Sequence, residues 1–95
     1  MTEDPTTASG FYGISAAARL SGVGEQALRL YERKGLLTPA RTDGGTRRYT
    51  DDDVTVLRRV AALLADGLNL TGARRVLELE ADNDRLRLRI AELTD

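Results

Sequence analysis

Four segments of this chain of 95 residues carry apolar residues three or four positions apart, the spacing of one face of a helix. In the first segment, Ile14, Ala17 and Leu20 predict a short helix with one buried face, and Ser15 is expected to cap its N-terminus. A turn over 21–24 contains two glycines, which allow the next helix to approach closely. The pattern therefore predicts two short helices joined by a tight turn.

The second segment predicts a helix over 25–34 that ends at Gly35, because glycine commonly follows the last helical turn. Ala27, Leu28 and Tyr31 share one face of this helix, and we expect them to pack inside the protein. A helix that is buried on one side and cationic on the other is suited to the major groove of DNA. The residues on the opposite face are Gln26, Arg29, Leu30 and Arg33.

Between the second and third helical segments, the alternating pattern predicts two short strands over 36–41 and 46–50 with a turn at 42–45. The two glycines of the turn permit positive φ and let the backbone approach a phosphate. Arg47 and Arg48 are consecutive and point to opposite faces, so we expect one to bind phosphate and the other to pack or to pair with aspartates of the next helix. The candidate DNA contacts of this hairpin, which we call the wing, are Arg41, Gly44, Gly45, Thr46, Arg47, Arg48 and Tyr49.

A third helix is predicted to follow the wing, because Thr50 and Asp53 have the spacing of a capping box. It is expected to extend to about Asp66, and Gly67 ends it. Thr71 is expected to cap the next helix. The predicted buried residues of the third helix are Val54, Leu57, Val60, Ala61 and Leu64.

The C-terminal part of the chain has a heptad-like pattern of alternating three- and four-residue spacings. Such a stripe needs a partner helix, which predicts a coiled-coil-like helix and a homodimer. Asn83 at an inward position would fix the register of the pair at some cost in stability. The residues of this stripe are Val76, Leu79, Asn83, Leu86, Ile90 and Leu93.

The amino-acid composition favours a helical protein and excludes several kinds of site. Hydrophobic residues make up 41% of the chain and aromatic residues 4%, which favours a helical core of small aliphatic side chains. The chain has no cysteine and no histidine, which excludes disulfides and Cys/His zinc sites, and we expect no metal and no cofactor. The net charge is −1, yet residues 11–59 hold nine basic against six acidic residues. No segment has the length and apolar character of a membrane span.

Five short motifs follow one another along the second helix and the wing. They are Leu28-Arg29, Tyr31-Glu32-Arg33, Gly35-Leu36, Pro39-Ala40-Arg41 and Gly45-Thr46-Arg47-Arg48-Tyr49. In order and spacing they resemble the DNA-binding part of the MerR family of bacterial transcription regulators. The resemblance extends from about Ile14 to Leu79, and the run Leu68–Gly72 is most similar to the heat-shock repressor branch of the family. The resemblance implies a winged helix-turn-helix in which Arg29 contacts DNA and Arg74 touches the backbone from a second wing.

These observations predict a mainly α fold with a disordered leader over 1–10, a winged helix-turn-helix domain over 11–79 and a short dimerisation helix over 80–95. The candidate DNA contacts of the two short helices are Ser15, Gln26, Arg29, Leu30, Tyr31 and Arg33. Tyr31 and Tyr49 are interpreted mainly as core anchors whose hydroxyls can reach phosphate. Only Glu80–Asp95 follows the resemblance, which predicts no enclosed effector pocket.

The predicted function is that of a sequence-specific transcription regulator, acting as a repressor, and not that of an enzyme. It is expected to bind a palindromic operator on double-stranded DNA as a homodimer. Its expected location is the bacterial cytoplasm, at the nucleoid. The heat-shock branch implies a chaperone as protein co-regulator. Two alternatives remain open at this stage. One is an architectural, excisionase-like protein on direct repeats, and the other is an antitoxin or interaction module that uses the C-terminal stripe.

Overall fold

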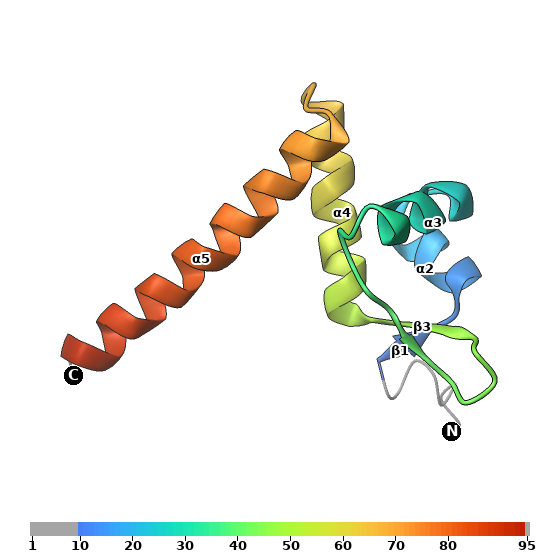
Figure 1. Ribbon diagram of the computed structural model, residues 1–95, viewed down its shortest axis with the longest axis horizontal. Coiled ribbons are helices and arrows are strands. Elements are labelled where there is room, and N and C mark those ends of the chain that lie inside the picture. Colours follow the sequence, from blue (N-terminus) through green and yellow to red (C-terminus); the bar gives the residue numbers. More distant parts are fainter. Residues whose placement is uncertain (1–9, 95) are drawn as a thin grey trace. The chain divides into compact units, whose positions relative to one another are not determined.

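The computed structural model describes residues 10–94, so the leader predicted over 1–10 lies outside the described residues except for Gly10. The described chain divides into two compact units, the first ending at Ala62 and the second beginning at Leu63. Each unit is described by itself. Most of the described residues lie in helices, as predicted. In chain order the elements are β1 (Phe11–Tyr12), α2 (Ile14–Ser21), α3 (Glu25–Arg33), β2 (Ala40–Arg41), β3 (Arg47–Thr50), α4 (Asp51–Ala65) and α5 (Leu70–Thr94) (Figure 1).

The wing is part of a three-stranded antiparallel sheet with the order β1-β3-β2. The hairpin of β2 and β3 was predicted, but β2 covers only Ala40–Arg41, and residues 36–39 are not strand. Strand β1 was not predicted, because a two-residue strand is too short to show alternation. It pairs Phe11 with Thr50, and the Tyr12 hydroxyl donates a hydrogen bond of 2.6 Å to Asp51 Oδ1 at the start of α4.

The predicted helix-turn-helix is present as α2 and α3, with two corrections in α2. The N-cap of α2 is Gly13, so Ser15 lies inside the helix and does not cap it. Leu20 is 41% exposed rather than buried, because the buried face of this short helix runs through Ala17 and Ser21. The Leu20 carbonyl, at the C-terminal end of α2, accepts hydrogen bonds of 3.0 and 2.8 Å from Nε and Nη2 of Arg58 in α4.

Helix α3 ends as its sequence predicts. Gly35 follows the helix with a φ of 79°, and its amide donates to the Glu32 carbonyl at 3.1 Å. The Leu36 amide then donates to the Tyr31 carbonyl at 3.0 Å, which completes a Schellman-type ending. This ending turns the chain out of the helix, and residues 36–39 then lead to β2 of the wing.

The hydrophobic core of the first unit is formed by α2, α3, the sheet and most of α4. The capping box at the start of α4 is confirmed, since the Thr50 amide donates to Asp53 Oδ2 at 2.9 Å and the Asp53 amide to Thr50 Oγ1 at 3.0 Å. Of the residues predicted to be buried on α4, Ala61 and Leu64 are only half-buried. The buried residues of this unit include Ala17, Val23, Leu28, Tyr31, Leu37, Tyr49, Val54, Leu57 and Val60.

The second unit contains the end of α4, with Leu63 buried, and the whole of α5. Gly67 ends α4 with a φ of 102°, as predicted. The residue that caps α5 is Asn69 rather than Thr71, since Asn69 Oδ1 accepts a 2.8 Å hydrogen bond from the Gly72 amide. Helix α5 then continues without a break to Thr94. Within residues 10–94, no helix combines the length and the apolar character needed to cross a membrane.

Candidate nucleic-acid interface

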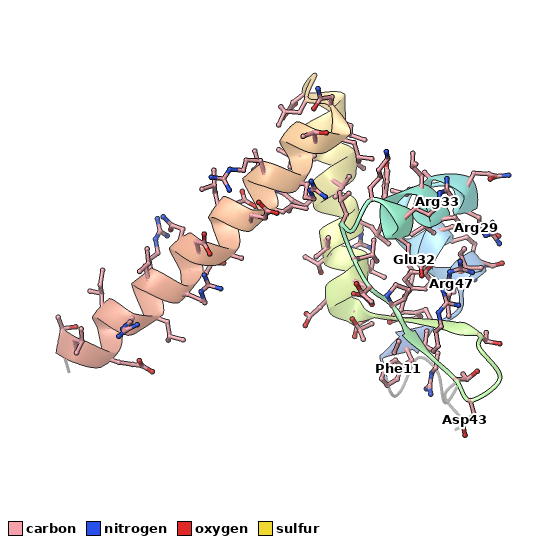
Figure 2. All side chains as sticks on the ribbon, in the orientation of Figure 1. Phe11, Arg29, Glu32, Arg33, Asp43 and Arg47 are labelled. Atoms are coloured by element: carbon pink, nitrogen blue, oxygen red, sulfur yellow. The ribbon has the colours of Figure 1, made fainter. Side chains whose placement is uncertain are left out.

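Helix α3 has one buried and one open face, as predicted. Leu28 is fully buried and Tyr31 is 6% exposed, so this side of the helix is fixed in the core, whereas Ala27, also predicted to pack inside, is only half-buried. On the other side Gln26 and Arg33 are exposed and Leu30 is half-buried. The side chain of Arg29 is 40% exposed. The predicted groove-facing residues of α3 are thus accessible. Figure 2 labels two of them, Arg29 and Arg33.

Arg29 lies near two other polar residues on the α2–α3 side of this surface. Its Nη2 atom is 3.9 Å from Glu25 Oε1, a loose ion pair between two side chains that are each about two-fifths exposed. Glu25 also accepts a 3.0 Å hydrogen bond from the Ser15 hydroxyl. Exposed ion pairs of this kind contribute little to stability, so the Arg29 guanidinium can leave Glu25 for a DNA base or phosphate at small cost.

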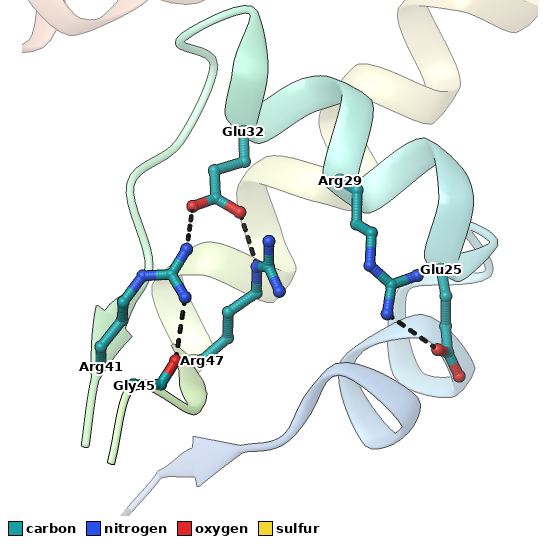
Figure 3. A network of polar contacts seen from close by, with 6 residues as sticks. All are labelled: Glu25, Arg29, Glu32, Arg41, Gly45 and Arg47. Atoms are coloured by element: carbon teal, nitrogen blue, oxygen red, sulfur yellow. Dashed lines mark hydrogen bonds and ion pairs between the residues drawn. The ribbon is translucent and has the colours of Figure 1, made fainter. Parts of the chain in front are cut away.

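Glu32 connects α3 to the wing (Figure 3). Its Oε1 atom lies 2.6 Å from Arg47 Nε, and its Oε2 atom lies 2.7 Å from Arg41 Nη2. Arg41 and Arg47 are directly opposite each other on β2 and β3, an arrangement that is unfavourable for two like charges. The carboxylate between them offsets this repulsion. We call this group of three residues the Glu32 clamp.

The clamp also determines the protonation of its carboxyl group. The hydrogen bond from Arg47 is the largest cause that lowers the pKa of Glu32 below its ordinary value of 4.5, and Arg41 adds to it, while partial burial acts in the opposite direction. The same contact raises the pKa of Arg47. Glu32 is therefore ionised at neutral pH, and α3 and the wing are joined by charge-assisted hydrogen bonds.

The turn of the wing is closed by its own backbone. The Thr42 amide donates to the Thr46 carbonyl at 2.8 Å, and the Gly45 amide donates to the Thr42 carbonyl at 2.9 Å. Gly45 has a φ of 88°, which a residue with a Cβ rarely adopts. Arg41 Nη1 donates to the Gly45 carbonyl at 3.0 Å, so the clamp and the turn share one arginine.

Arg48 points away from the clamp. Its guanidinium carbon lies 4.3 Å from the centroid of the Phe11 ring on β1. The prediction that Arg47 and Arg48 face opposite sides is confirmed. The predicted pairing of one of them with aspartates of the following helix is wrong, because Arg47 pairs with Glu32 of α3 and Arg48 lies over an aromatic ring.

The two tyrosines of the predicted site are core residues in this structure. Tyr49 is fully buried, and within the described residues its hydroxyl has no hydrogen-bond partner. Burial is the largest cause that raises the pKa of Tyr49. Its hydroxyl has no accessible surface, and Tyr31 has little, so the expectation that these hydroxyls reach phosphate does not agree with their burial. Both residues anchor the sheet and α3.

Arg74 belongs to the second unit, as does the predicted heptad-like stripe, which we call the α5 stripe because all six of its residues lie on α5. Arg74 is exposed near the start of α5, on the turn that follows the Asn69 cap. In the stripe, Val76 is half-buried, and Leu79, Leu86, Ile90 and Leu93 have exposed fractions between 50% and 79%. The described chain therefore leaves an apolar stripe along α5 open to a partner.

Two residues that shape the interface were not predicted from the sequence. The sequence shows Glu32 only as part of a motif, and it gives no sign that Phe11 belongs to the site. The spacing of Glu32 from Arg29, three residues on a helix, shows only that the two side chains lie on the same side of α3. No local signal indicates the contact of Phe11 with Arg48, because it depends on the pairing of β1 with β3. Among the described residues, no group of acidic side chains is arranged to hold a metal ion.

Residues 12–80 match the family described as MerR HTH family regulatory protein. The chain belongs to the MerR family. A putative heat shock protein HspR of Streptomyces coelicolor is 47% identical over 94 residues, which cover 98% of this chain and 60% of that protein. The transcriptional repressor CarH of Myxococcus xanthus is 43% identical over 67 residues, 70% of this chain and 22% of CarH. The chain thus spans at most 60% of the length of these two relatives.

Solved structures of the MerR family share the fold. A MerR family regulator that lacks the sensor domain, HiNmlR bound to promoter DNA, matches with a TM-score of 0.66 and 28% identity, over 88% of this chain and 76% of that chain. The N-terminal part of MtaN, a multidrug transporter activator of Bacillus subtilis, matches with a TM-score of 0.65 and 26% identity, over 86% and 87%. The predicted winged helix-turn-helix is confirmed, and the family is one of regulators rather than enzymes.

Proposed function

We propose that this MerR-family chain is a sequence-specific DNA-binding transcriptional repressor that binds a palindromic operator as a homodimer. The observation that carries the proposal is the Glu32 clamp, which fixes the wing beside the open face of α3. A helix held in this way can enter the major groove while the wing contacts the adjacent backbone. Gln26, Arg29 and Arg33 are the residues proposed to face the groove.

Arg29 is the residue best suited to read a base. Arginine forms bidentate hydrogen bonds with guanine in the major groove, and each such contact is worth about 1–3 kcal/mol of discrimination. The Glu25 carboxylate holds Arg29 only loosely. Gln26, one turn closer to the N-terminus of α3, is suited to adenine. The wing and Arg74 are proposed to contact the backbone, which contributes affinity without reading sequence.

The experiment compares Arg29→Ala with the wild-type protein on a fragment recovered by genomic footprinting. Affinity for this fragment should fall by about 1–3 kcal/mol, while affinity for random DNA should fall much less. Arg85→Ala is the matched control, because it removes the same charge from an exposed position of α5. An unchanged affinity of Arg29→Ala for the footprinted fragment would contradict the role of α3 as the reading helix.

The α5 stripe supports the dimeric part of the proposal. Leu86 and Ile90 are each 60% exposed, and a second copy of the same helix would cover them. Residues of both signs flank the stripe, with Glu80 and Arg87 on one side and Asp82 and Arg89 on the other. A second copy of the helix can therefore place opposite charges along both edges of the dimer interface. A two-fold dimer would match a palindromic site.

The similarity to a protein named as a heat shock protein favours heat-shock genes as targets, and a chaperone as co-regulator. Footprinting in cells before and after a temperature increase tests the first idea. Adding purified chaperone to the gel-shift reaction tests the second, since a co-repressor should increase operator affinity. Action at these genes would place the protein in the cytoplasm, at the nucleoid.

A further inference from the structure

Phe11 and Arg48 meet on the face of the sheet opposite the clamp. Phe11 is directly paired with Thr50, and Arg48 lies two residues before Thr50 on β3, so it is the diagonal neighbour of Phe11 on the same face. A long side chain can reach such a neighbour, and the Arg48 guanidinium carbon is 4.3 Å from the ring centroid. This distance is within the range of a cation–π interaction.

An aromatic ring and a carboxylate hold a guanidinium in different ways. The Glu32 carboxylate accepts N–H groups of Arg41 and Arg47 and neutralises charge. The Phe11 ring attracts the cation through its quadrupole and leaves the guanidinium charge in place. Within residues 10–94 the Arg48 guanidinium makes no hydrogen bond or ion pair, so its donors remain available.

We infer that Phe11 is a positioning residue that holds Arg48 ready to bind a phosphate of the DNA backbone, an inference that rests on the DNA-binding function proposed above. An arginine that is already ordered loses less side-chain entropy when it binds. Its planar guanidinium suits a phosphate, with which it can form two parallel hydrogen bonds. Of the two consecutive wing arginines, Arg48 is thus the phosphate ligand, and Arg47 holds the wing to α3.

The test measures binding of the full chain to a DNA duplex of random sequence over a range of salt concentrations, because a phosphate contact does not depend on sequence. Arg48→Ala should weaken binding and flatten the slope of log K against log salt by about 0.9, the value for one lost phosphate contact. Arg47→Ala should change this slope less, since Glu32 already neutralises Arg47.

Phe11→Leu should weaken binding about two- to fivefold, the effect of one exposed cation–π contact. In the Arg48→Ala background the same change should have no further effect, because Phe11 acts through Arg48. Pentafluorophenylalanine at position 11 retains the shape of the ring but reverses its quadrupole, and it should weaken binding as Phe11→Leu does. It therefore keeps the test decisive if Phe11→Leu destabilises the sheet.

Three results would overturn the inference. The first is that the losses of DNA affinity caused by Phe11→Leu and Arg48→Ala simply add in the double variant. The second is full DNA affinity with the fluorinated ring, and the third is a salt slope that is flattened by Arg47→Ala but not by Arg48→Ala. Failure of the proposed function is a separate result. In that case the wild-type protein would bind neither random nor footprinted DNA, or both Arg29→Ala and Arg48→Ala would bind as tightly as the wild type.

Discussion

The Nε atom of Arg47 lies 2.6 Å from Oε1 of Glu32, and this contact joins the wing to α3. The second carboxylate oxygen of Glu32 bonds Arg41 on the neighbouring strand. Because Arg41 and Arg47 are directly opposite each other, the hairpin would bring two like charges together without the carboxylate. Glu32 therefore has a role in the interface although it carries the charge that DNA repels.

Glu32→Gln should loosen the wing, because the amide cannot neutralise the two arginines. We expect the melting temperature to fall by about 2–5 °C, the range for a partly exposed ion-pair network in a domain of this size. Thermal unfolding followed by circular dichroism measures the change. The matched control is Glu78→Gln, since Glu78 pairs with Arg75 on α5 with both side chains more than half exposed. An equal effect of the two substitutions would contradict a special role of the clamp.

The contribution of the clamp to stability should depend on pH. The pKa of Glu32 is lowered in the folded protein, mainly by the hydrogen bond from Arg47, whereas the unfolded chain has the ordinary value of 4.5. The clamp's contribution is therefore complete above this ordinary pKa and is lost as the pH falls through the lowered folded value. The difference in melting temperature between wild type and Glu32→Gln should hold steady above pH 4.5 and shrink below it. A difference that persists unchanged in acid would assign the effect to packing instead.

Tyr49→Phe should leave the protein at least as stable as the wild type. The buried Tyr49 hydroxyl has no partner among the described residues, so its removal eliminates an uncompensated desolvation cost, which is typically about 1–3 kcal/mol. Urea unfolding measures the change, and DNA affinity should stay the same because the hydroxyl is inaccessible.

Tyr12→Phe provides the matched control for Tyr49→Phe. The Tyr12 hydroxyl donates to Asp51, so its removal should lower stability rather than raise it. A loss of stability or of DNA affinity in Tyr49→Phe would show that the Tyr49 hydroxyl has a partner in solution.

Changing Leu86 and Ile90 to Asp should prevent pairing through the α5 stripe. Unpaired charges buried in the seam cost several kcal/mol, so sedimentation should show a monomer with native helix content. Operator affinity should fall sharply, because each half-site would then bind alone. Leu88→Asp is the control, since Leu88 is 63% exposed and lies outside the stripe. A wild-type protein that sediments as a monomer would favour head-to-tail binding on direct repeats instead.

The sequence predicted those features that depend on neighbouring residues. The ending of α3 at Gly35 and the capping box of Thr50 and Asp53 are local, and both are confirmed. The two buried residues of α3, Leu28 and Tyr31, followed from their spacing. The open face of α3 followed from the same periodicity, and its contacts with DNA remain a prediction.

The features that were missed depend on how distant segments meet. Whether Glu32 bonds Arg47 depends on the position of the hairpin beside α3, which no periodicity determines. The burial of Leu20 was predicted from helical spacing, but α2 is too short for that spacing to identify its buried face. Ser15 and Thr71 were assigned as caps from residue type alone, and in each case the cap lies two residues earlier, at Gly13 and Asn69.

The alternation of side chains along β3 limits how the wing can change in length. Arg47 faces α3 and Arg48 faces Phe11 because the strand repeats every two residues. A single residue inserted or deleted between Arg47 and Tyr49 would place these two side chains on opposite faces, so that the clamp and the burial of Tyr49 could not both be kept. In natural and engineered relatives, insertions of one residue should therefore be confined to the turn over 42–46. Insertions or deletions inside β3 should involve two residues at a time.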